Sequence, residues 1–400
     1  LYIHLPYCEK LCHYCACTKI ITRNHQVEAP YITALKNEWD RYKALFGARP
    51  VVREFHLGGG TPTFFSPENL KALLGYILED AFIPENHEYS FEGHPNTTTL
   101  GHLQALSELG FNRMSLGVQD FSPKVQEAIN RVQAYETVKE ITGQARRLGY
   151  QSVNYDLIFG LPYQDAGCID NTIEKIEELQ PDRLAFYSYA HVPWKEKSQG
   201  VFSQNDIPSG DAKRALYERG RAGFERLGYR EVGMDHFALP DDALYIALQQ
   251  KRLHRNFMGF NTSRTELLVG LGMSAISDAK YAYAQNAKSV REYAGLVNSG
   301  AFAHIRGYSL TQTDVAVRRQ ILELMCHYEL PWDQYAQAFH PPEIHNDLEA
   351  FRADGLIRFA DGKIKVTETG KTFIRNISAA FDHYLRAKKA RNAQQFSKSI

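Results

Sequence analysis

The stretch that decides the fold is LYIHLPYCEKLCHYCAC, residues 1–17, in which a short β-branched and aromatic run leads directly into four cysteines. The run at 1–5 has the composition of a buried strand. The rest of the 400-residue chain contains two more cysteines, Cys168 and Cys326. Six cysteines are too few for a disulfide scaffold in a chain of this length, and their clustering predicts metal or redox chemistry in a reducing compartment.

Five further apolar runs follow this strand, and segments with helical spacing lie between them. The predicted strands span 1–5, 53–57, 88–93, 113–118, 152–160 and 183–190. The predicted helices include 30–46, 66–78 and 136–149, with Ser66 as an N-cap before Pro67 and with Gly149 as a C-cap. Repeated strand–helix units indicate an α/β fold with parallel strands and right-handed crossovers.

A barrel, a partial barrel and an open doubly wound sheet all fit this alternation. In each of them the ligand binds at the carboxyl ends of the strands. The chemically interesting residues fall at or beside these ends: the cysteine loop, GGGTPT at 58–63, Glu92, Gln119 and Asp156.

The composition changes near residue 305. Predicted helices at 309–328 and 341–355 are followed by a hairpin that turns at Asp361-Gly362 and by a long helix over 371–391. This order predicts a small, mostly α-helical, winged-helix-like domain. We therefore expect a catalytic domain over 1–300 and a C-terminal domain over 301–400, which packs rather than reads DNA because no basic face accompanies it.

The charge balance excludes several classes of protein. Lys+Arg and Asp+Glu both number 46, so the formal net charge is zero, which argues against a general nucleic-acid or membrane-surface binder. No apolar run of eighteen residues is present, so no membrane span is expected. We expect a cytoplasmic monomer.

The spacing of the cysteines, Cys8-x3-Cys12-x2-Cys15-x-Cys17, allows four interpretations. A zinc site lacks a second ligand pair, and a thioredoxin-like CxxC does not call for two further cysteines. Cysteines at 8, 12 and 15 also follow the spacing of a helix face, but LPYC after a strand is a poor helix start. The fourth interpretation is a [4Fe–4S] cluster with three thiolate ligands, whose fourth iron is open to an external ligand.

Two further features support the cluster. Glycines at the end of the second strand, in LGGGTPT at 57–63, let the backbone approach a ligand closely, and no Lys follows as a P-loop requires. Glu92 ends a buried strand where a carboxylate can accept from ribose hydroxyls, although a lone strand-end Glu is more often in a surface ion pair.

The three-cysteine loop after a first strand resembles the radical S-adenosylmethionine (SAM) superfamily, which builds a partial (β/α)6 barrel. Together, seven motifs over nearly the whole chain resemble the oxygen-independent coproporphyrinogen III oxidase (coproporphyrinogen dehydrogenase) family. They are YIHLPYCEKLCHYCACTKI (2–20), HLGGGTPT (56–63), LGVQDF (116–121), NYDLIFGLP (154–162), GMDHFALPDD (233–242), LHRNFMGF (253–260) and RNISAAFDHYLR with QQFSKSI (375–386 and 394–400).

The resemblance implies an oxidoreductase of heme (porphyrin) biosynthesis. In the family, two propionate side chains of coproporphyrinogen III are oxidatively decarboxylated to vinyl groups, which gives protoporphyrinogen IX. A 5′-deoxyadenosyl radical abstracts hydrogen, and the cofactors are a [4Fe–4S] cluster and two SAM molecules. A radical is needed because an unactivated C–H bond has no acidity that a side-chain base can use. A low-potential electron donor of flavodoxin or ferredoxin type and an unidentified electron acceptor are also implied.

The resemblance assigns residues as well, and leaves the chemistry itself to the cluster and SAM. Cys8, Cys12 and Cys15 match the cluster ligands, and Cys17 is not expected to be a ligand. The positions that match the two SAM sites are Tyr2, Gly59, Glu92 and Ile276 for the cluster-bound molecule, and Tyr14, Gly60, Thr61, Gln119, Arg131, Asp156 and Ala190 for the second. Tyr14, His94 and Met258 depart from the family pattern; Met258 stands where some members carry Gln.

Two other functions are compatible with the same sequence. One is a heme-binding or heme-delivery paralog without decarboxylase activity, which Cys17 and Phe257 argue against. The other is a radical SAM methyltransferase or an anaerobic heme-degrading enzyme, whose cofactor machinery would look the same. His4, Arg131 and Arg255 are candidate partners for the substrate carboxylates.

Overall fold

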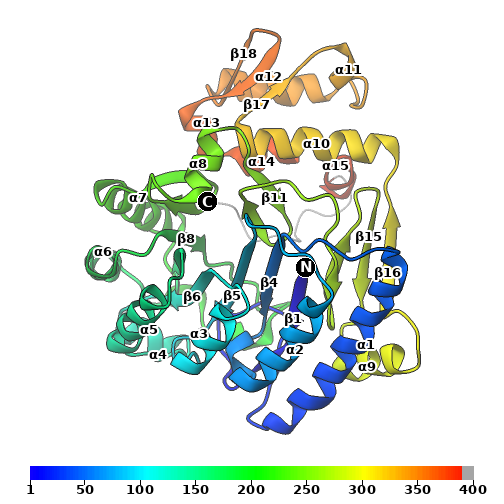
Figure 1. Cartoon of the computed structure of the whole chain (residues 1–400). Helices are drawn as coiled ribbons and strands as arrows, with labels where there is room; N and C mark the ends of the chain where they lie inside the picture. Colours follow the sequence, from blue (N-terminus) through cyan, green and yellow to red (C-terminus); the bar gives the residue numbers. More distant parts are fainter. Residues whose placement is uncertain (390–400) are drawn as a thin grey trace. The chain divides into compact units, whose positions relative to one another are not determined.

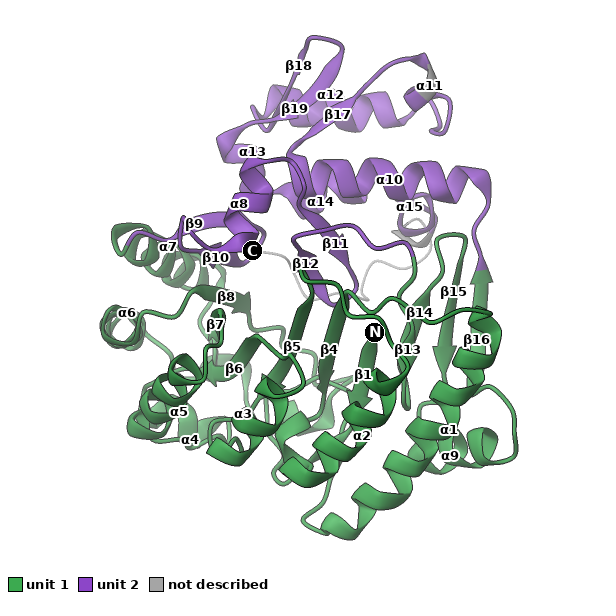
Figure 2. Cartoon of the chain, in the orientation of Figure 1, with its two compact units in different colours: residues 1–227, 267–308, 400 green, residues 228–266, 309–399 purple. Residues whose placement is uncertain are grey.

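The computed structural model describes residues 1–389. Residues 390–400, which include the predicted family motif at 394–400, lie outside the described residues. The chain divides into two compact units, shown in green and purple in Figure 2. Unit 1 comprises Leu1–Leu227 and Leu267–Tyr308, and unit 2 comprises Gly228–Glu266 and the chain from Ser309 onward. The chain therefore enters unit 2 twice.

Unit 1 is built on a parallel sheet in which all six predicted strands are present. In sheet order they are β1 (Tyr2–Leu5), β4 (Glu54–Gly59), β5 (Glu88–Gly93), β6 (Arg113–Gln119), β7 (Ser152–Phe159) and β8 (Arg183–Ser188). Consecutive strands are neighbours, and β1 pairs with β4 from Tyr2 opposite His56 to Leu5 opposite Gly59. The very short β13 (Gly270–Leu271) pairs with the other side of β1.

Helices line the outer side of this curved sheet (Figure 1). They are α1 (Glu28–Phe46), α2 (Pro67–Glu79), α3 (Leu100–Ser107), α4 (Pro123–Ala128), α5 (Tyr135–Arg147), α6 (Ala166–Leu179) and α7 (Gly210–Arg226). The predicted end signals are confirmed, because the Ser66 side chain accepts a hydrogen bond from Asn69 N at the start of α2. Gly149, beyond the end of α5, has a φ of 84°. Alternating strands and outer helices form the partial (β/α)6 barrel that the family resemblance implies.

The core of unit 1 lies between these helices and the sheet. All four residues of β1 are buried, as expected for a strand covered on both faces. Helix α2 shows the matching pattern at i, i+3, i+4, i+7 and i+8, and its buried residues are Leu70, Leu73, Leu74, Ile77 and Leu78. Each buried leucine contributes about 2 kcal/mol relative to an exposed one.

The segment after β13 forms elements that the sequence did not predict. Strands β14 (Ile276–Asp278), β15 (Ala282–Asn286) and β16 (His304–Ser309) form an antiparallel sheet, with α9 (Val290–Asn298) between the last two. Glu38 on α1 fastens this segment: its buried carboxylate accepts from Gly272 N (2.8 Å), Asn286 Nδ2 (2.7 Å) and the Tyr293 hydroxyl (2.7 Å).

Unit 2 combines two separate stretches of chain. The first holds β9 (Arg230–Gly233), β10 (His236–Ala238), α8 (Ala243–Gln249), β11 (His254–Asn256) and β12 (Gly259–Asn261). The second holds α10 (Gln312–His327), β17 (Glu329–Pro331), α11 (Gln334–Gln337), α12 (Ile344–Ala353), β18 (Ile357–Ala360), β19 (Lys363–Val366), α13 (Glu368–Thr372), α14 (Ile374–Ala379) and α15 (His383–Lys389). Helices around the three-stranded sheet β17-β19-β18 give the predicted winged-helix-like character.

Local predictions for the C-terminal region were partly right. The β18–β19 hairpin turns at Asp361 and Gly362, whose φ values of 55° and 69° suit a tight hairpin turn. The long helix over 371–391 was wrong, because α14 ends before Phe381. Phe381 is fully buried and packs edge-on against Trp332, while the Asp382 carboxylate accepts from Leu385 N and starts α15.

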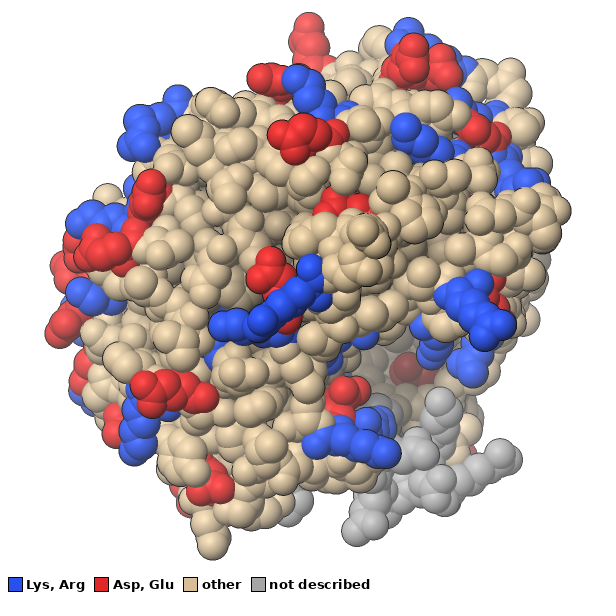
Figure 3. Space-filling model, turned by 90° about the horizontal axis from the view of Figure 1, so that it is seen from below, with Lys and Arg blue, Asp and Glu red and all other residues tan. Residues whose placement is uncertain are grey.

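The surface charge is mixed on the face that Figure 3 shows, where basic and acidic side chains are interspersed. This agrees with the formal net charge of zero. Among residues 1–389, no helix is both long and apolar enough to cross a membrane.

Candidate active site

A loop that carries the four clustered cysteines follows β1. The short strands β2 (Tyr7–Cys8) and β3 (Ile20–Ile21) pair in parallel and close its base. Cys8 and Cys12 are buried, Cys15 is half-buried and Cys17 is exposed, and all four are free thiols. The loop is not helical and its cysteines form no disulfide bond, so the thiols are available as ligands.

Contacts from distant parts of unit 1 hold the cysteine loop in place. His13 N donates to Ile129 O (2.9 Å), and Asn130 Nδ2 donates to Leu11 O (2.8 Å). On the other side, Gln199 Nε2 donates to Tyr14 O (3.0 Å). Contacts with the barrel therefore help to fix the conformation of the loop.

The glycine-rich segment at the end of β4 forms a second wall of the same cavity. Gly60 N donates to Leu5 O (2.9 Å) and Thr61 N to Tyr7 O (3.0 Å), so this segment runs directly against the chain that enters the cysteine loop. A Cβ on Gly60 would lie 2.5 Å from Pro6 O, a distance that requires glycine at this position.

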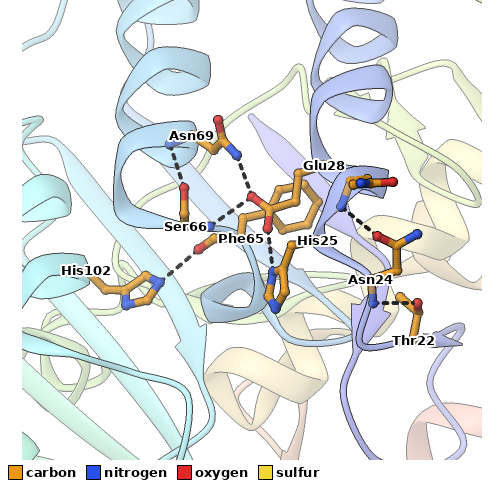
Figure 4. Close-up of polar contacts among 9 residues, drawn as sticks. Thr22, Asn24, His25, Glu28, Phe65, Ser66, Asn69 and His102 are labelled. Atoms are coloured by element: carbon orange, nitrogen blue, oxygen red, sulfur yellow. Dashed lines mark hydrogen bonds and ion pairs between the residues drawn. The ribbon is translucent and has the colours of Figure 1, made fainter.

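A buried carboxylate connects the chain segments that follow the two walls. Figure 4 shows Glu28, at the start of α1, between His25 of the short helix η1 (His25–Val27) and the first turn of α2. Its oxygens accept from Ser66 N (2.9 Å), Asn69 Nδ2 (2.7 Å) and His25 Nδ1 (2.7 Å). The His25 ring stacks on Phe64 of η2 (Pro62–Phe64), with 4.4 Å between ring centroids. Glu28 thus joins the chain leaving the cysteine loop to the chain leaving the glycine segment.

Glu92 at the end of β5 faces the end of β4. Its Oε1 lies 3.3 Å from His56 Nε2, and His56 Nδ1 lies 2.7 Å from Ser90 Oγ. The Tyr2 ring stacks on the His56 ring, and a Cβ on Gly58 would lie 3.0 Å from Glu92 Oε1. His56 therefore orients the Glu92 carboxylate, and Ser90 in turn orients His56. Because Gly58 has no side chain, it leaves space for the Glu92 carboxylate.

The guanidinium group of Arg131 lies beside Cys12 and lines the same cavity. Its Nε and Nη2 donate to Gly117 O (3.2 and 2.5 Å), and Nη1 lies 3.5 Å from Cys12 Sγ. Gln119 ends β6 with a φ of 68°, at a shift in the β6–β7 register. This irregularity ends the regular pairing where Gln119 and Arg131 meet the cavity.

Asp156 on β7 is oriented by two neighbours. Ser115 Oγ donates to its Oδ2 (2.9 Å), and Asn154 Nδ2 donates to its Oδ1 (2.9 Å). Burial is the main cause that raises the pKa of Asp156 to about 6, and the nearby Glu92 raises it further. The carboxylate is still mostly ionised at pH 7 and can accept hydrogen bonds.

These side chains meet around one cavity of about 400 Å³. It is lined by most of the predicted site residues: Cys8, Cys12, Cys15, Tyr14, Gly59, Gly60, Thr61, Glu92, Gln119, Arg131 and Asp156. Tyr2, Ala190 and Ile276 are not among the lining residues. Tyr2 stacks on His56, which contacts the lining residue Glu92; Ala190 lies beyond the end of β8, and Ile276 begins β14.

The thiols differ in their acidity. Burial raises the pKa of Cys8 to about 11, although a hydrogen bond with Thr61 opposes this shift. A hydrogen bond with the Cys17 side chain is the main cause that lowers the pKa of Cys15 to about 6. Within residues 1–389, no three His, Cys, Asp or Glu side chains are placed to hold one metal ion. Three thiols around a larger cavity fit an iron–sulfur cluster, in which each cysteine binds a different iron.

Several residues that line this cavity or contact its lining were not predicted as part of the site. Ser115 and Asn154 orient Asp156, and the spacing of Asn154 and Asp156, two apart on one strand, was the available signal. Lys19 also lines the cavity, and only the folded loop shows its role. His94 lines the cavity too; burial lowers its pKa to about 2, so the ring is neutral.

Comparison with known proteins agrees with this geometry. Residues 2–176 match the family model of the radical SAM superfamily. The chain is 39% identical to the oxygen-independent coproporphyrinogen III oxidase of Pseudomonas aeruginosa, covering 100% of this chain and 88% of that protein. It is 38% identical to the protein of the same name from Escherichia coli K12, with the same two coverages.

The solved structure of coproporphyrinogen III oxidase from Escherichia coli, described as a radical SAM enzyme, superposes with a TM-score of 0.90. The match has 37% sequence identity and covers 96% of this chain and 89% of that chain. The fold and the cysteine loop thus define a radical SAM enzyme. More narrowly, the chain belongs to the oxygen-independent coproporphyrinogen III oxidase family.

Proposed function

We propose that this chain oxidatively decarboxylates two propionate side chains of coproporphyrinogen III to vinyl groups without oxygen, which gives protoporphyrinogen IX. The observation that carries the proposal is the single cavity in which three free cysteines meet the glycine segment and Glu92, in a chain similar to the named oxidases over its full length. The substrate is inferred from the family resemblance, and the cofactor site is inferred from the residues that line the cavity.

Cys8, Cys12 and Cys15 would hold a [4Fe–4S] cluster, leaving one iron for SAM. Bound together, cluster and SAM supply a radical that can take hydrogen from an unactivated carbon. The task of the protein is to bind, orient and exclude water. Arg131, whose Nη1 lies 3.5 Å from Cys12 Sγ, provides positive charge that favours the thiolate forms of Cys8 and Cys15.

Tyr2, Gly59, Glu92 and Ile276 are the proposed contacts of the cluster-bound SAM. Glu92 accepts hydrogen bonds from ribose hydroxyls, and its orientation by His56 limits the entropy lost on binding. Gly59, whose φ is 118°, lets the backbone pass close to the amino-acid head group.

A second SAM is proposed at Tyr14, Gly60, Thr61, Gln119, Arg131, Asp156 and Ala190. Asp156, oriented by Ser115 and Asn154, suits ribose hydroxyls. Arg131 suits a carboxylate, because two of its nitrogens already hold it rigidly on Gly117 O.

The remaining partners are inferred from the resemblance. They are a low-potential electron donor of flavodoxin or ferredoxin type and a separate electron acceptor. His4, Arg131 and Arg255 stay candidate partners for the substrate carboxylates. A monomeric state and a cytoplasmic location stay predictions, as does the absence of nucleic-acid binding.

The test is an anaerobic assay of the reconstituted protein with a low-potential reductant, SAM and coproporphyrinogen III, followed by mass spectrometry. We expect stepwise loss of two carboxyl groups with release of 5′-deoxyadenosine. Cys12→Ser should abolish both, whereas Cys326→Ser, a buried cysteine of unit 2, should retain both. SAM cleavage without decarboxylation would favour a heme-degrading enzyme or a methyltransferase. No cleavage by a fully loaded protein would favour a heme-binding paralog.

A further inference from the structure

Lys19 occupies a defined position in the cysteine loop. Its Nζ donates to Cys15 O (2.9 Å) and to Cys17 O (3.3 Å), and the residue lines the cavity. The next residue, Ile20, begins β3, where its N donates to Pro6 O (2.8 Å). The Lys19 side chain is therefore fixed at both ends. Its backbone adjoins the β2–β3 pair, and two carbonyl groups accept from its ammonium group.

The charge of Lys19 is not cancelled by these contacts. Both acceptors are neutral carbonyl groups, and both belong to the short turn that presents Cys15. An ammonium on a flexible stem is normally a mobile, strongly hydrated charge, and an arrangement that immobilises it against a ligand loop fixes its electric field. Arg131, which contacts Cys12 Sγ at 3.5 Å, is a second fixed cation beside the thiols.

We propose that Lys19 sets the reduction potential of the cluster held by Cys8, Cys12 and Cys15, and that it orders the turn that presents Cys15. This inference rests on the proposed function, since it requires these three cysteines to hold the cluster. One electron from a low-potential donor makes the cluster more negative by one charge. A fixed cation stabilises the reduced form more than the oxidised form and so raises the potential.

Two roles of Lys19 can be separated by substitution. Lys19→Met removes both the charge and the donors, and Lys19→Gln removes the charge but keeps an amide donor for the carbonyls. Lys19→Arg keeps the charge. Lys10 is a matched control, since it is an exposed lysine of the same loop that also lines the cavity.

The experiment is an anaerobic redox titration of the reconstituted holoenzymes, followed by electron paramagnetic resonance of the reduced cluster, with iron and sulfide content measured for each. We expect Lys19→Met and Lys19→Gln to favour the oxidised cluster by about tenfold at a given potential, which for one electron is about 59 mV. Lys19→Arg should restore the wild-type potential, and Lys10→Met should shift it less.

The outcomes separate this inference from the proposed function. Fully loaded Lys19→Met and Lys19→Gln proteins with the wild-type potential would overturn the role of Lys19 and leave the proposed function intact. An equal shift in Lys10→Met would also overturn it, because any charge at the cavity would then suffice. If Lys19→Met fails to retain iron, the reduction potential of Lys19→Gln tests the proposal in its place. A wild-type protein that holds no cluster would overturn both.

Discussion

Gly117 makes room for the Arg131 guanidinium at the end of β6. A Cβ at this position would lie 2.6 Å from Arg131 Nη2 and 2.8 Å from Gln119 Nε2, so both proposed SAM contacts would have to move. We expect Gly117→Ala to weaken SAM binding by tenfold or more, on the order of 1.4 kcal/mol, while the cluster stays loaded. Equilibrium dialysis with labelled SAM measures the effect.

Gly75 provides the matched control for this substitution. It lies in α2, and a Cβ there would meet nothing within 4 Å. Gly75→Ala should leave SAM affinity unchanged and raise the stability by about 0.5–1 kcal/mol, because alanine suits a helix interior better than glycine. Equal SAM affinity in Gly117→Ala and wild type would show that the Arg131 position is not critical.

Glu38 predicts a pH dependence of stability. Burial raises its pKa from the ordinary 4.5 to about 7, against three hydrogen bonds that favour the ionised form. The folded state therefore binds a proton more tightly than the unfolded state, and stability is lost as pH rises from 4.5 through 7. Between pH 5 and 8 the loss is on the order of 2 kcal/mol.

Substitution isolates the contribution of this carboxyl. Glu38→Gln cannot titrate, so its free energy of unfolding, measured anaerobically in urea, should fall less than that of the wild type over pH 5–8. Contributions of all other groups cancel in the difference between the two proteins. Parallel curves would mean that the hydrogen bonds from Gly272, Asn286 and Tyr293 keep Glu38 ionised throughout.

At the scale of elements, Glu28 joins the beginnings of α1 and α2 (Figure 4). Glu28→Ala would leave the Ser66 amide and the Asn69 side chain without their buried acceptor. We expect a loss of about 1–3 kcal/mol in the free energy of unfolding, measured by urea denaturation. Glu79→Ala, at the exposed last residue of the same α2, should not lower it, because an acidic side chain at a helix C-terminus is unfavourable.

Long elements with clear periodicity could be predicted from the sequence, and short ones could not. Strand β5 has the predicted bounds, and α2 starts where Ser66 and Pro67 indicate, because these signals are local. Strands β13 and β14 have only two and three residues, too few for any period, and their place depends on β1 and on Glu38. The same limit explains the break before Asp382, where burial of Phe381 overrides a helical pattern.

In the candidate site too, features with a local sequence signal could be predicted, and features that depend on the folded chain could not. Cysteine spacing and the glycine run are local signals, and both lead to the cavity that the structure shows. The position of Lys19 could not be predicted, because its partners are backbone carbonyls whose direction depends on the folded loop. Contacts such as Asn130 to Leu11, between residues 119 positions apart, also leave no trace in a local pattern.

At the scale of the whole molecule, the boundary between the units differs from the simplest division of the sequence. The predicted catalytic domain over 1–300 includes Gly228–Glu266, which the structure assigns to unit 2. Within unit 2 this stretch shares a core with the C-terminal chain: Cys326 packs in one cluster with Val232, Leu253 and Phe260. A pattern of strands and helices read along the chain does not reveal that two separated stretches fold together.

This arrangement predicts how shortened chains will behave. A chain ending at residue 308 would leave Gly228–Glu266 without Cys326 and without the Tyr328 hydroxyl, which donates to Val232 O (3.2 Å). It would also lose the ion pair between Asp235 and Arg375. We expect this chain to expose apolar surface, bind the dye ANS and aggregate.

A second shortened chain serves as the comparison. It joins 1–227 to 267–308 through a Gly/Ser linker and so removes both stretches of unit 2 together. Because unit 1 then keeps its parallel sheet and the Glu38 contacts to Gly272 and Asn286, we expect less ANS binding and a sharper thermal transition than for 1–308. If 1–308 is instead the better folded of the two, Gly228–Glu266 belongs energetically to the barrel, and the boundary near residue 300 is the correct one.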